Sequence, residues 1–266
     1  MGTSLVVTSG KGGVGKTTTS ANIGTALALQ GKRVVMLDLD IGLRNLDVVL
    51  GLSNRIIYDI VDVATGRAKL HQALIKDKRF DDLLYVLPAA QNADKDSVMP
   101  EDVVEIVNQL RDDFDFIILD SPAGIEQGFR NASAGADGAI VVTTPEVSSV
   151  SDADRIVGLL EQQEMPIAPR LVINRIRPHM MTDGRSMDVD EITKHLGIGL
   201  LGIVVDDDEV IASTNKGETV VMEPDNPASQ GYRNIARRLL GESVPLMAIE
   251  EKKPGFWARL FRRNQA

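Results

Sequence analysis

The sequence predicts an α/β fold, with a mostly parallel β-sheet flanked by helices on both faces. Two observations support this class. Short apolar runs alternate along the chain with helix-like segments, which is typical of repeated βα units. Several of the runs are continuously apolar rather than alternating, as strands covered on both faces require. The length of 266 residues suits one such domain.

Each expected element follows from its local pattern. The strands are rich in Val, Ile and Leu and cover residues 5–9, 33–38, 83–87, 116–120, 138–143, 170–173 and 200–205. The helices cover residues 16–30, 100–114, 147–163, 189–196 and 227–240. The last helix has the clearest start, because Asn226 can cap it and Pro227 suits the first helical position.

Composition excludes several functional classes. The chain has no cysteine, which excludes disulfides, thiolate metal sites and iron–sulfur ATPases. Its net charge of −9 argues against broad nucleic-acid binding. No secretory signal is present at the N-terminus, so the cytoplasm is the expected compartment.

A phosphate-binding loop follows the first strand. Residues 10–17 fit the pattern G-x-x-x-x-G-K-[ST], and a helix pattern follows directly. Glycines let successive backbone N–H groups turn toward phosphate oxygens, and the helix N-terminus adds a positive dipole end. Lys16 would contact the β- and γ-phosphates of a nucleotide, and Thr17 would bind Mg²⁺. The nucleotide-binding residues predicted here are Gly10, Lys11, Gly12, Gly13, Val14, Gly15, Lys16, Thr17 and Thr18.

Carboxylates follow two of the predicted strands. Asp120 ends an apolar run, which is the Walker B pattern for a residue that holds Mg²⁺. Asp38 and Asp40 close the second strand on the same side of the chain. Because ligands of α/β sheets bind at the carboxyl ends of strands, these side chains are expected beside the phosphate loop.

The extra lysine in the loop, Lys11, makes residues 11–18 resemble the deviant Walker A motif of the MinD/ParA class of P-loop ATPases. In that class this lysine reaches across a homodimer to the partner's phosphates, so that two ATP molecules lie between two subunits. Residues 38–47 resemble the family's switch I, and residues 121–124 its switch II turn. The match implies that Asp40 positions the attacking water and that Asp38 supports the Mg²⁺ shell.

The resemblance extends over nearly the whole chain and is strongest to the septum-site-determining members of the class. Residues 72–79, 120–126 and 145–150 carry it in addition to the switches. It implies a contact of Asn174 with adenine, which the donor and acceptor of an asparagine amide suit. It also implies that Asp152 lies where partner proteins bind. The implied partners are a MinC-like inhibitor of division-ring polymerisation and a MinE-like activator of hydrolysis.

The C-terminal segment differs in charge from the body. Residues 252–266 carry five cations and no acid, so the total of −9 leaves the preceding residues at −14. At helical spacing Phe256, Trp257, Leu260 and Phe261 share one face and the arginines share the other. This pattern predicts an amphipathic helix that lies on an anionic membrane surface. A helix packed on its own core or on a partner protein is the alternative.

The sequence therefore divides into an ATPase domain (residues 1–240), a connector (241–254) and a membrane-targeting tail (255–266). The expected function is an ATP-dependent, Mg²⁺-requiring membrane switch that places the division site from the inner face of the cell membrane. A flagellar-number ATPase and a ParA-like partitioning ATPase are the alternatives within the class. A nucleotide-binding scaffold without turnover is the alternative outside it.

Overall fold

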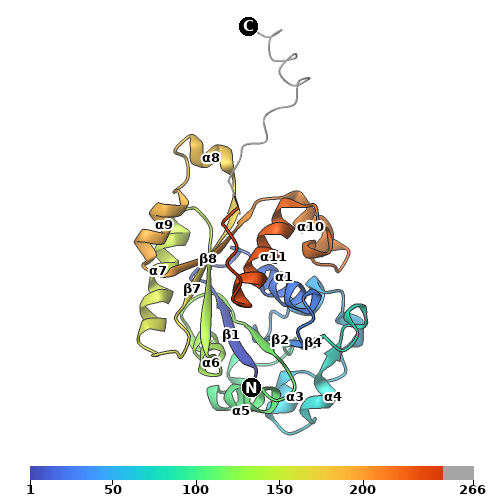
Figure 1. Ribbon diagram of the computed structural model, residues 1–266. Coiled ribbons are helices and arrows are strands. Elements are labelled where there is room, and N and C mark those ends of the chain that lie inside the picture. Colours follow the sequence, from blue (N-terminus) through green and yellow to red (C-terminus); the bar gives the residue numbers. More distant parts are fainter. Residues whose placement is uncertain (248–266) are drawn as a thin grey trace.

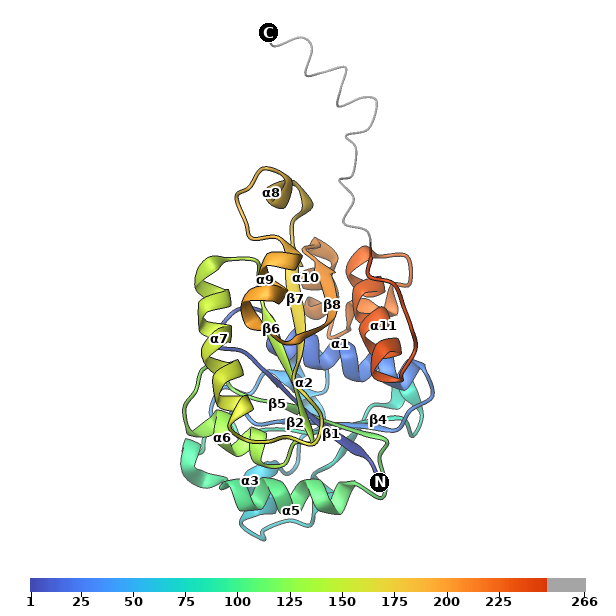
Figure 2. The same ribbon diagram turned by 60° about the vertical axis from the view of Figure 1, so that its left-hand side comes forward.

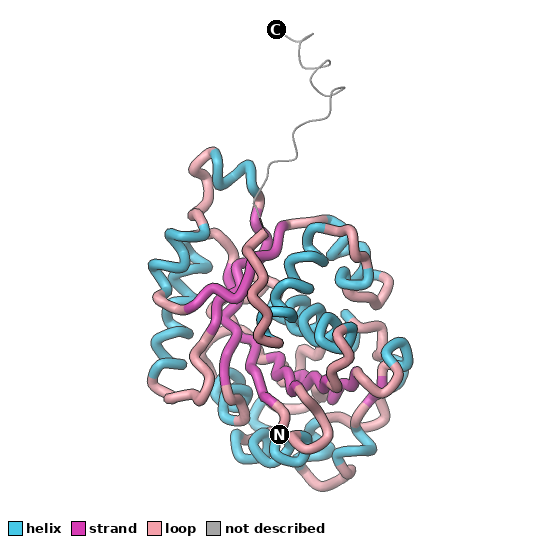
Figure 3. Tube along the Cα trace, viewed as in Figure 1, coloured by secondary structure: helices cyan, strands magenta, loops and turns pink. Residues whose placement is uncertain are grey.

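The computed structural model describes residues 1–247, so the predicted tail lies outside the described residues. Within residues 1–247, an eight-stranded sheet runs through the molecule with helices on both sides (Figures 1 and 3). The strands are β1 (Thr3–Thr8), β2 (Val34–Asp38), β3 (Ile75–Lys76), β4 (Leu84–Leu87), β5 (Phe116–Asp120), β6 (Gly138–Thr143), β7 (Arg170–Ile176) and β8 (Gly199–Val205).

The strand order is β3-β4-β2-β5-β1-β6-β7-β8. All neighbouring pairs are parallel except β3 and β4, which are antiparallel. The central strands β1, β2 and β5 therefore end at the same edge of the sheet, where the predicted phosphate loop and carboxylates meet. The predicted fold class is confirmed.

The helices connect these strands and cover both faces of the sheet. They are α1 (Lys16–Leu29), α2 (Leu46–Val49), α3 (Ile60–Ala64), α4 (Leu70–Ala73), α5 (Pro100–Leu110), α6 (Gln127–Ala134), α7 (Val147–Glu161), α8 (Pro178–Thr182), α9 (Val189–Leu196), α10 (Asp208–Asn215) and α11 (Pro227–Leu239). None of the helices within residues 1–247 is both long enough and apolar enough to cross a bilayer.

Two hydrophobic clusters lie on the two faces of the sheet. One includes buried residues of α3, α5, α6, α7 and α9. The other includes buried residues of α1, α2 and α11, with Tyr232 among its largest fully buried side chains. Figure 2 shows α7 and α9 on one side of the strands and α1 and α11 on the other. Both faces of the central strands are thus removed from water, which explains their continuously apolar sequences.

The structure adds elements that the sequence pattern did not indicate. β3 has only two residues, which is too short for a recognisable period. The predicted helix 100–114 ends at Leu110, and the strand that starts at Arg170 extends to Ile176. The asparagine cap is confirmed, because Asn226 Oδ1 accepts from the N–H groups of Ala228 and Ser229.

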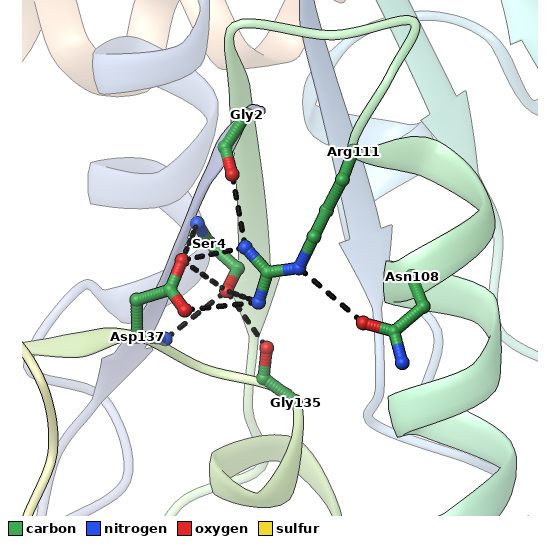
Figure 4. Close-up of polar contacts among 6 residues, drawn as sticks. All are labelled: Gly2, Ser4, Asn108, Arg111, Gly135 and Asp137. Carbon is green, nitrogen blue, oxygen red and sulfur yellow. Dashed lines mark hydrogen bonds and ion pairs between the residues drawn. The ribbon is translucent and has the colours of Figure 1, made fainter.

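An ion pair between Arg111 and Asp137 stabilises the edge of the sheet opposite the phosphate loop (Figure 4). Arg111, which follows α5, donates from Nη1 and Nη2 to the Asp137 carboxylate at 2.7 and 2.9 Å. The same guanidinium donates to the Gly2 carbonyl at 2.9 Å, and Ser4 Oγ donates to the Gly135 carbonyl at 2.7 Å. Burial by itself raises the pKa of Asp137, but Arg111 and Ser4 hold it below its ordinary value.

We expect Arg111→Ala to lower the free energy of unfolding at pH 7 by about 1–3 kcal/mol, since several charge-assisted hydrogen bonds are lost. A depressed carboxylate pKa stabilises the fold above the unfolded-state pKa, and this stabilisation is lost as pH falls through the folded-state pKa. Urea titrations should therefore show the difference between wild type and variant shrinking below about pH 4. Arg67→Ala is the control, because Arg67 forms an exposed pair with Asp62. Equal effects of both substitutions would contradict this role of Arg111.

Candidate nucleotide site

The loop between β1 and α1 forms an open cradle of backbone. Gly13 and Gly15 have φ angles of 81° and 93°, in the left-handed region that favours glycine. Nothing lies within 4 Å of a Cβ built on Gly12 or Gly13, so these residues face open space. Side chains there would fill the volume that phosphate oxygens need. The loop is thus shaped as its sequence predicts.

The back of the loop, in contrast, is closely packed. A Cβ on Gly10 would lie 2.0 Å from the carbonyl oxygen of Asp152 in α7, and one on Gly15 would lie 2.5 Å from Asn174 Nδ2. That amide nitrogen donates to the Val14 carbonyl at 2.9 Å, and Asn174 itself is buried. Neighbouring elements therefore hold the loop against the sheet, and Asp152 lies directly beside it.

The three predicted carboxylates meet at this edge. Asp38 and Asp120 occupy paired positions on β2 and β5, and both are 1% exposed. Asp38 accepts from the N–H groups of Asp40, Asn45 and Leu46 at 3.0–3.1 Å, so it holds the turn of switch I. Its support of the Mg²⁺ shell stays a prediction.

Asp120 lies next to the first turn of α1. Its Oδ1 accepts from Ser20 Oγ at 2.7 Å, and the Lys16 ammonium and the Thr17 hydroxyl also act on it. Burial raises its pKa to about 6. Burial and the Asp120 charge raise the pKa of Asp38 to about 7. Two adjacent buried carboxylates favour a cation at this edge.

A cavity of about 450 Å³ opens in front of these groups. The phosphate loop, both switches and the end of β7 contribute to its walls. We call it the phosphate cavity; its lining includes Gly12, Gly13, Lys16, Thr17, Asp40, Asn45, Lys95 and Arg175. The cradle, the ammonium group, and the hydroxyl and carboxylate oxygens fit a nucleoside triphosphate with Mg²⁺.

Lys11 is directed elsewhere. It does not line the phosphate cavity of the described chain, and its Nζ donates to Ser148 Oγ at 3.0 Å at the start of α7. Its side chain is thus exposed at the start of α7 rather than turned to the chain's own phosphate site. The structure brings all predicted loop residues, Asp38, Asp40, Asp120, Asn174 and Asp152 to one edge. The membrane residues Phe256, Trp257, Leu260 and Phe261 lie outside the described residues.

The sequence analysis assigned no role to two basic residues that line the phosphate cavity, Lys95 and Arg175. Lys95 belongs to a loop without a motif, and only the fold brings it to the site. Arg175 follows Asn174 and has a φ of 55°, which is uncommon for a residue with a side chain. That strain in the backbone could not be inferred from the sequence.

Comparison with known proteins gives a consistent family. The model of the CobQ/CobB/MinD/ParA nucleotide binding domain matches residues 5–220. The septum site-determining protein MinD of Bacillus subtilis is 65% identical over 260 residues, which cover 98% of this chain and 97% of that protein.

Solved structures agree. The MinC:MinD cell division protein complex of Aquifex aeolicus contains a chain with a TM-score of 0.85 and 46% identity, covering 92% of this chain and 98% of that one. The septum site-determining protein MinD of Pyrococcus horikoshii, complexed with Mg-ADP, has a TM-score of 0.81 and 28% identity, covering 90% and 96%.

Asn174→Ala tests whether this residue supports the loop or contacts adenine. Loss of the donor to the buried Val14 carbonyl should weaken binding of fluorescent ATP and GTP analogues by a similar factor, about tenfold. Asn54→Ala, an exposed asparagine in a surface turn, is the control. Weaker binding of the adenine nucleotide alone would instead support the adenine contact.

Proposed function

The chain belongs to the MinD group of the CobQ/CobB/MinD/ParA nucleotide-binding family, and we propose that it acts as a nucleotide-controlled membrane switch. It is an ATPase that uses Mg²⁺ and functions in placing the division site. The observation that carries the switch proposal is the direction of Lys11. This signature lysine extends from the loop to Ser148 while Lys16 lines the chain's own phosphate cavity.

The residues of one chain have separate tasks in hydrolysis. Lys16 and the N–H groups of the glycine-rich loop bind the phosphates, and Asp40 orients the attacking water at the side of the γ-phosphate. Thr17 and Asp120 would hold Mg²⁺, which supplies charge neutralisation of the phosphates when bound. Asp38 positions Asp40, because its carboxylate accepts from the Asp40 N–H group.

ATP controls the assembly of two chains. We infer a homodimer in which Lys11 of each chain reaches the phosphates of its partner, as a positive charge acting on the transition state. Lys11 is exposed and can leave Ser148 at low cost, because a hydrogen bond between exposed groups is replaced by water. Because the phosphates of the triphosphate are what Lys11 of the partner chain would contact, we expect the dimer to form only when both sites hold ATP.

The tail couples this dimer to the inner face of the cell membrane. A single tail, in the helix that its sequence predicts, should bind an anionic bilayer weakly through its four large apolar side chains, because ordering the segment offsets much of the gain. Two tails on one dimer make the second insertion intramolecular, which raises avidity about 10²–10⁴-fold. Hydrolysis would then separate the two chains, so that each carries a single weakly binding tail and the protein leaves the membrane.

Partner proteins complete the cycle. One similar solved structure is a complex of MinC with MinD, and we propose that a MinC-like inhibitor is recruited to the membrane-bound dimer. A MinE-like activator would stimulate hydrolysis there. Asp152 is the residue proposed for partner contact, since its backbone touches Gly10 and its helix begins beside Lys11.

The alternatives within the class are not favoured. A ParA family ATPase from Chlorobium tepidum shares the fold with a TM-score of 0.75 but is 24% identical. The body of this chain is also acidic rather than basic, which does not suit a DNA-binding surface.

Two substitutions separate dimer formation from membrane binding. Lys11→Ala should bind nucleotide but stay monomeric with Mg-ATP, and Leu260→Glu should dimerise but not sediment with anionic liposomes. Sedimentation velocity measures the mass, and liposome co-sedimentation measures binding in ATP and in ADP. Lys78→Ala, an exposed lysine elsewhere, and Ala258→Glu, which at helical spacing falls outside the apolar face of the predicted tail, are the controls and should behave as wild type.

A Lys11→Ala chain that still dimerises would contradict the trans role of the lysine. Liposome binding by Leu260→Glu, or equal binding of the wild type in ATP and ADP, would contradict the membrane switch. Binding in neither nucleotide would identify the tail as a protein-binding or core-packing helix.

A further inference from the structure

The loop between β4 and α5 carries a lysine at the phosphate cavity. Lys95 starts a short 3₁₀ turn (Lys95–Ser97) and lines the cavity together with Asp40. Its charge also acts on the Asp40 carboxyl, where it opposes the rise in pKa caused by burial. Lys95 therefore lies on the side of the site where the γ-phosphate of a triphosphate would be.

Lys95 also lies between two cavities. A second cavity of about 280 Å³ shares Asp40, Lys95, Pro122 and Ala123 with the phosphate cavity. It extends from switch I to α6 behind the switch II turn. Lys95 is thus placed where both switch segments meet.

The segment that carries this lysine is hydrogen-bonded to switch I and to α6, the helix that follows the switch II turn. We call residues 90–98 the bridging segment. At one end the Ala90 carbonyl accepts from the Gly42 N–H of switch I at 2.9 Å. At the other end the Val98 carbonyl accepts from Asn131 Nδ2 of α6 at 2.6 Å, and Gln127 Nε2 donates to Asn131 Oδ1 at 2.8 Å. A shift of the bridging segment would therefore act on switch I and on α6.

The ammonium group of Lys95 is available for a ligand. Asp94 and Asp96 flank it in the sequence, yet within residues 1–247 Lys95 forms no ion pair within 4.0 Å. Its side chain is exposed at the cavity, in contrast to the buried Lys16. A long flexible lysine so placed can turn to an added phosphoryl group without breaking another ion pair.

We propose that Lys95 binds the γ-phosphate in cis and makes the bridging segment a third sensor of the nucleotide state. The diphosphate lacks the group that Lys95 would contact, so the segment is held against the site only in the triphosphate state. Switch I and α6 then receive the signal through Ala90 and Val98. This inference rests on the proposed ATP switch and adds the residue that reads the terminal phosphate from within one chain.

The test compares triphosphate and diphosphate binding in a Lys11→Ala background, which removes the proposed contact from a partner. Lys95→Ala should weaken binding of a non-hydrolysable ATP analogue about tenfold or more, as expected for a charge-assisted hydrogen bond. Binding of ADP should change by less than about twofold. Lys95→Arg should recover most of the loss, and Lys78→Ala is the matched control.

Hydrogen exchange supplies a readout that does not depend on turnover. Amides of residues 90–98 should be more protected with the ATP analogue than with ADP in the wild type, and Lys95→Ala should remove that difference. Equal losses for ATP and ADP, no loss for ATP, or wild-type exchange independent of the γ-phosphate would overturn the proposal. A wild-type chain that fails to dimerise with ATP would instead contradict the switch itself.

Discussion

The proximity of two buried carboxylates at the end of the sheet determines much of this molecule. Asp38 and Asp120 stand on neighbouring parallel strands, almost fully removed from water. Burial of like charges disfavours their ionised forms, and the pKa of each is raised. The nearby Lys16 ammonium and backbone N–H groups offset only some of this cost. The site is therefore arranged for a ligand that brings further positive charge, as Mg²⁺ does.

The same edge connects nucleotide binding to distant surfaces through close backbone packing. Gly10 touches the backbone of Asp152 in α7, and Gly15 packs on Asn174. Switch I is held by Asp38 and is bonded through Gly42 to the bridging segment. Because Gly10 has no side chain, the backbone of the phosphate loop lies directly against α7. A movement of the loop on nucleotide binding can therefore shift α7 as well as the switches. These are the surfaces on which the proposed dimer and partner contacts depend.

Local chemistry was predictable from the sequence where it is encoded by neighbours along the chain. The spacing of the glycines predicts the conformation of the phosphate loop. The apolar run that ends in Asp120 predicts a buried strand with a carboxylate at the edge of the sheet. The contact of Asn174 with Val14, 160 positions apart, and the placement of Lys95 arise from strand order. Local sequence patterns do not indicate the order of the strands in the sheet. The sequence patterns did not predict short elements such as β3 and α8, because two and five residues are too few to show the period of a strand or a helix.

Thermal unfolding of Asp120→Asn, with and without Mg-ATP, tests the electrostatic account most directly. A raised carboxyl pKa means that the ionised group costs folding free energy at pH 7. The variant should therefore melt about 2–4 °C or more above the wild type without nucleotide. Mg-ATP should raise the melting temperature of the wild type but have little effect on the variant. A variant that melts below the wild type without nucleotide, or gains as much from Mg-ATP, would contradict the account.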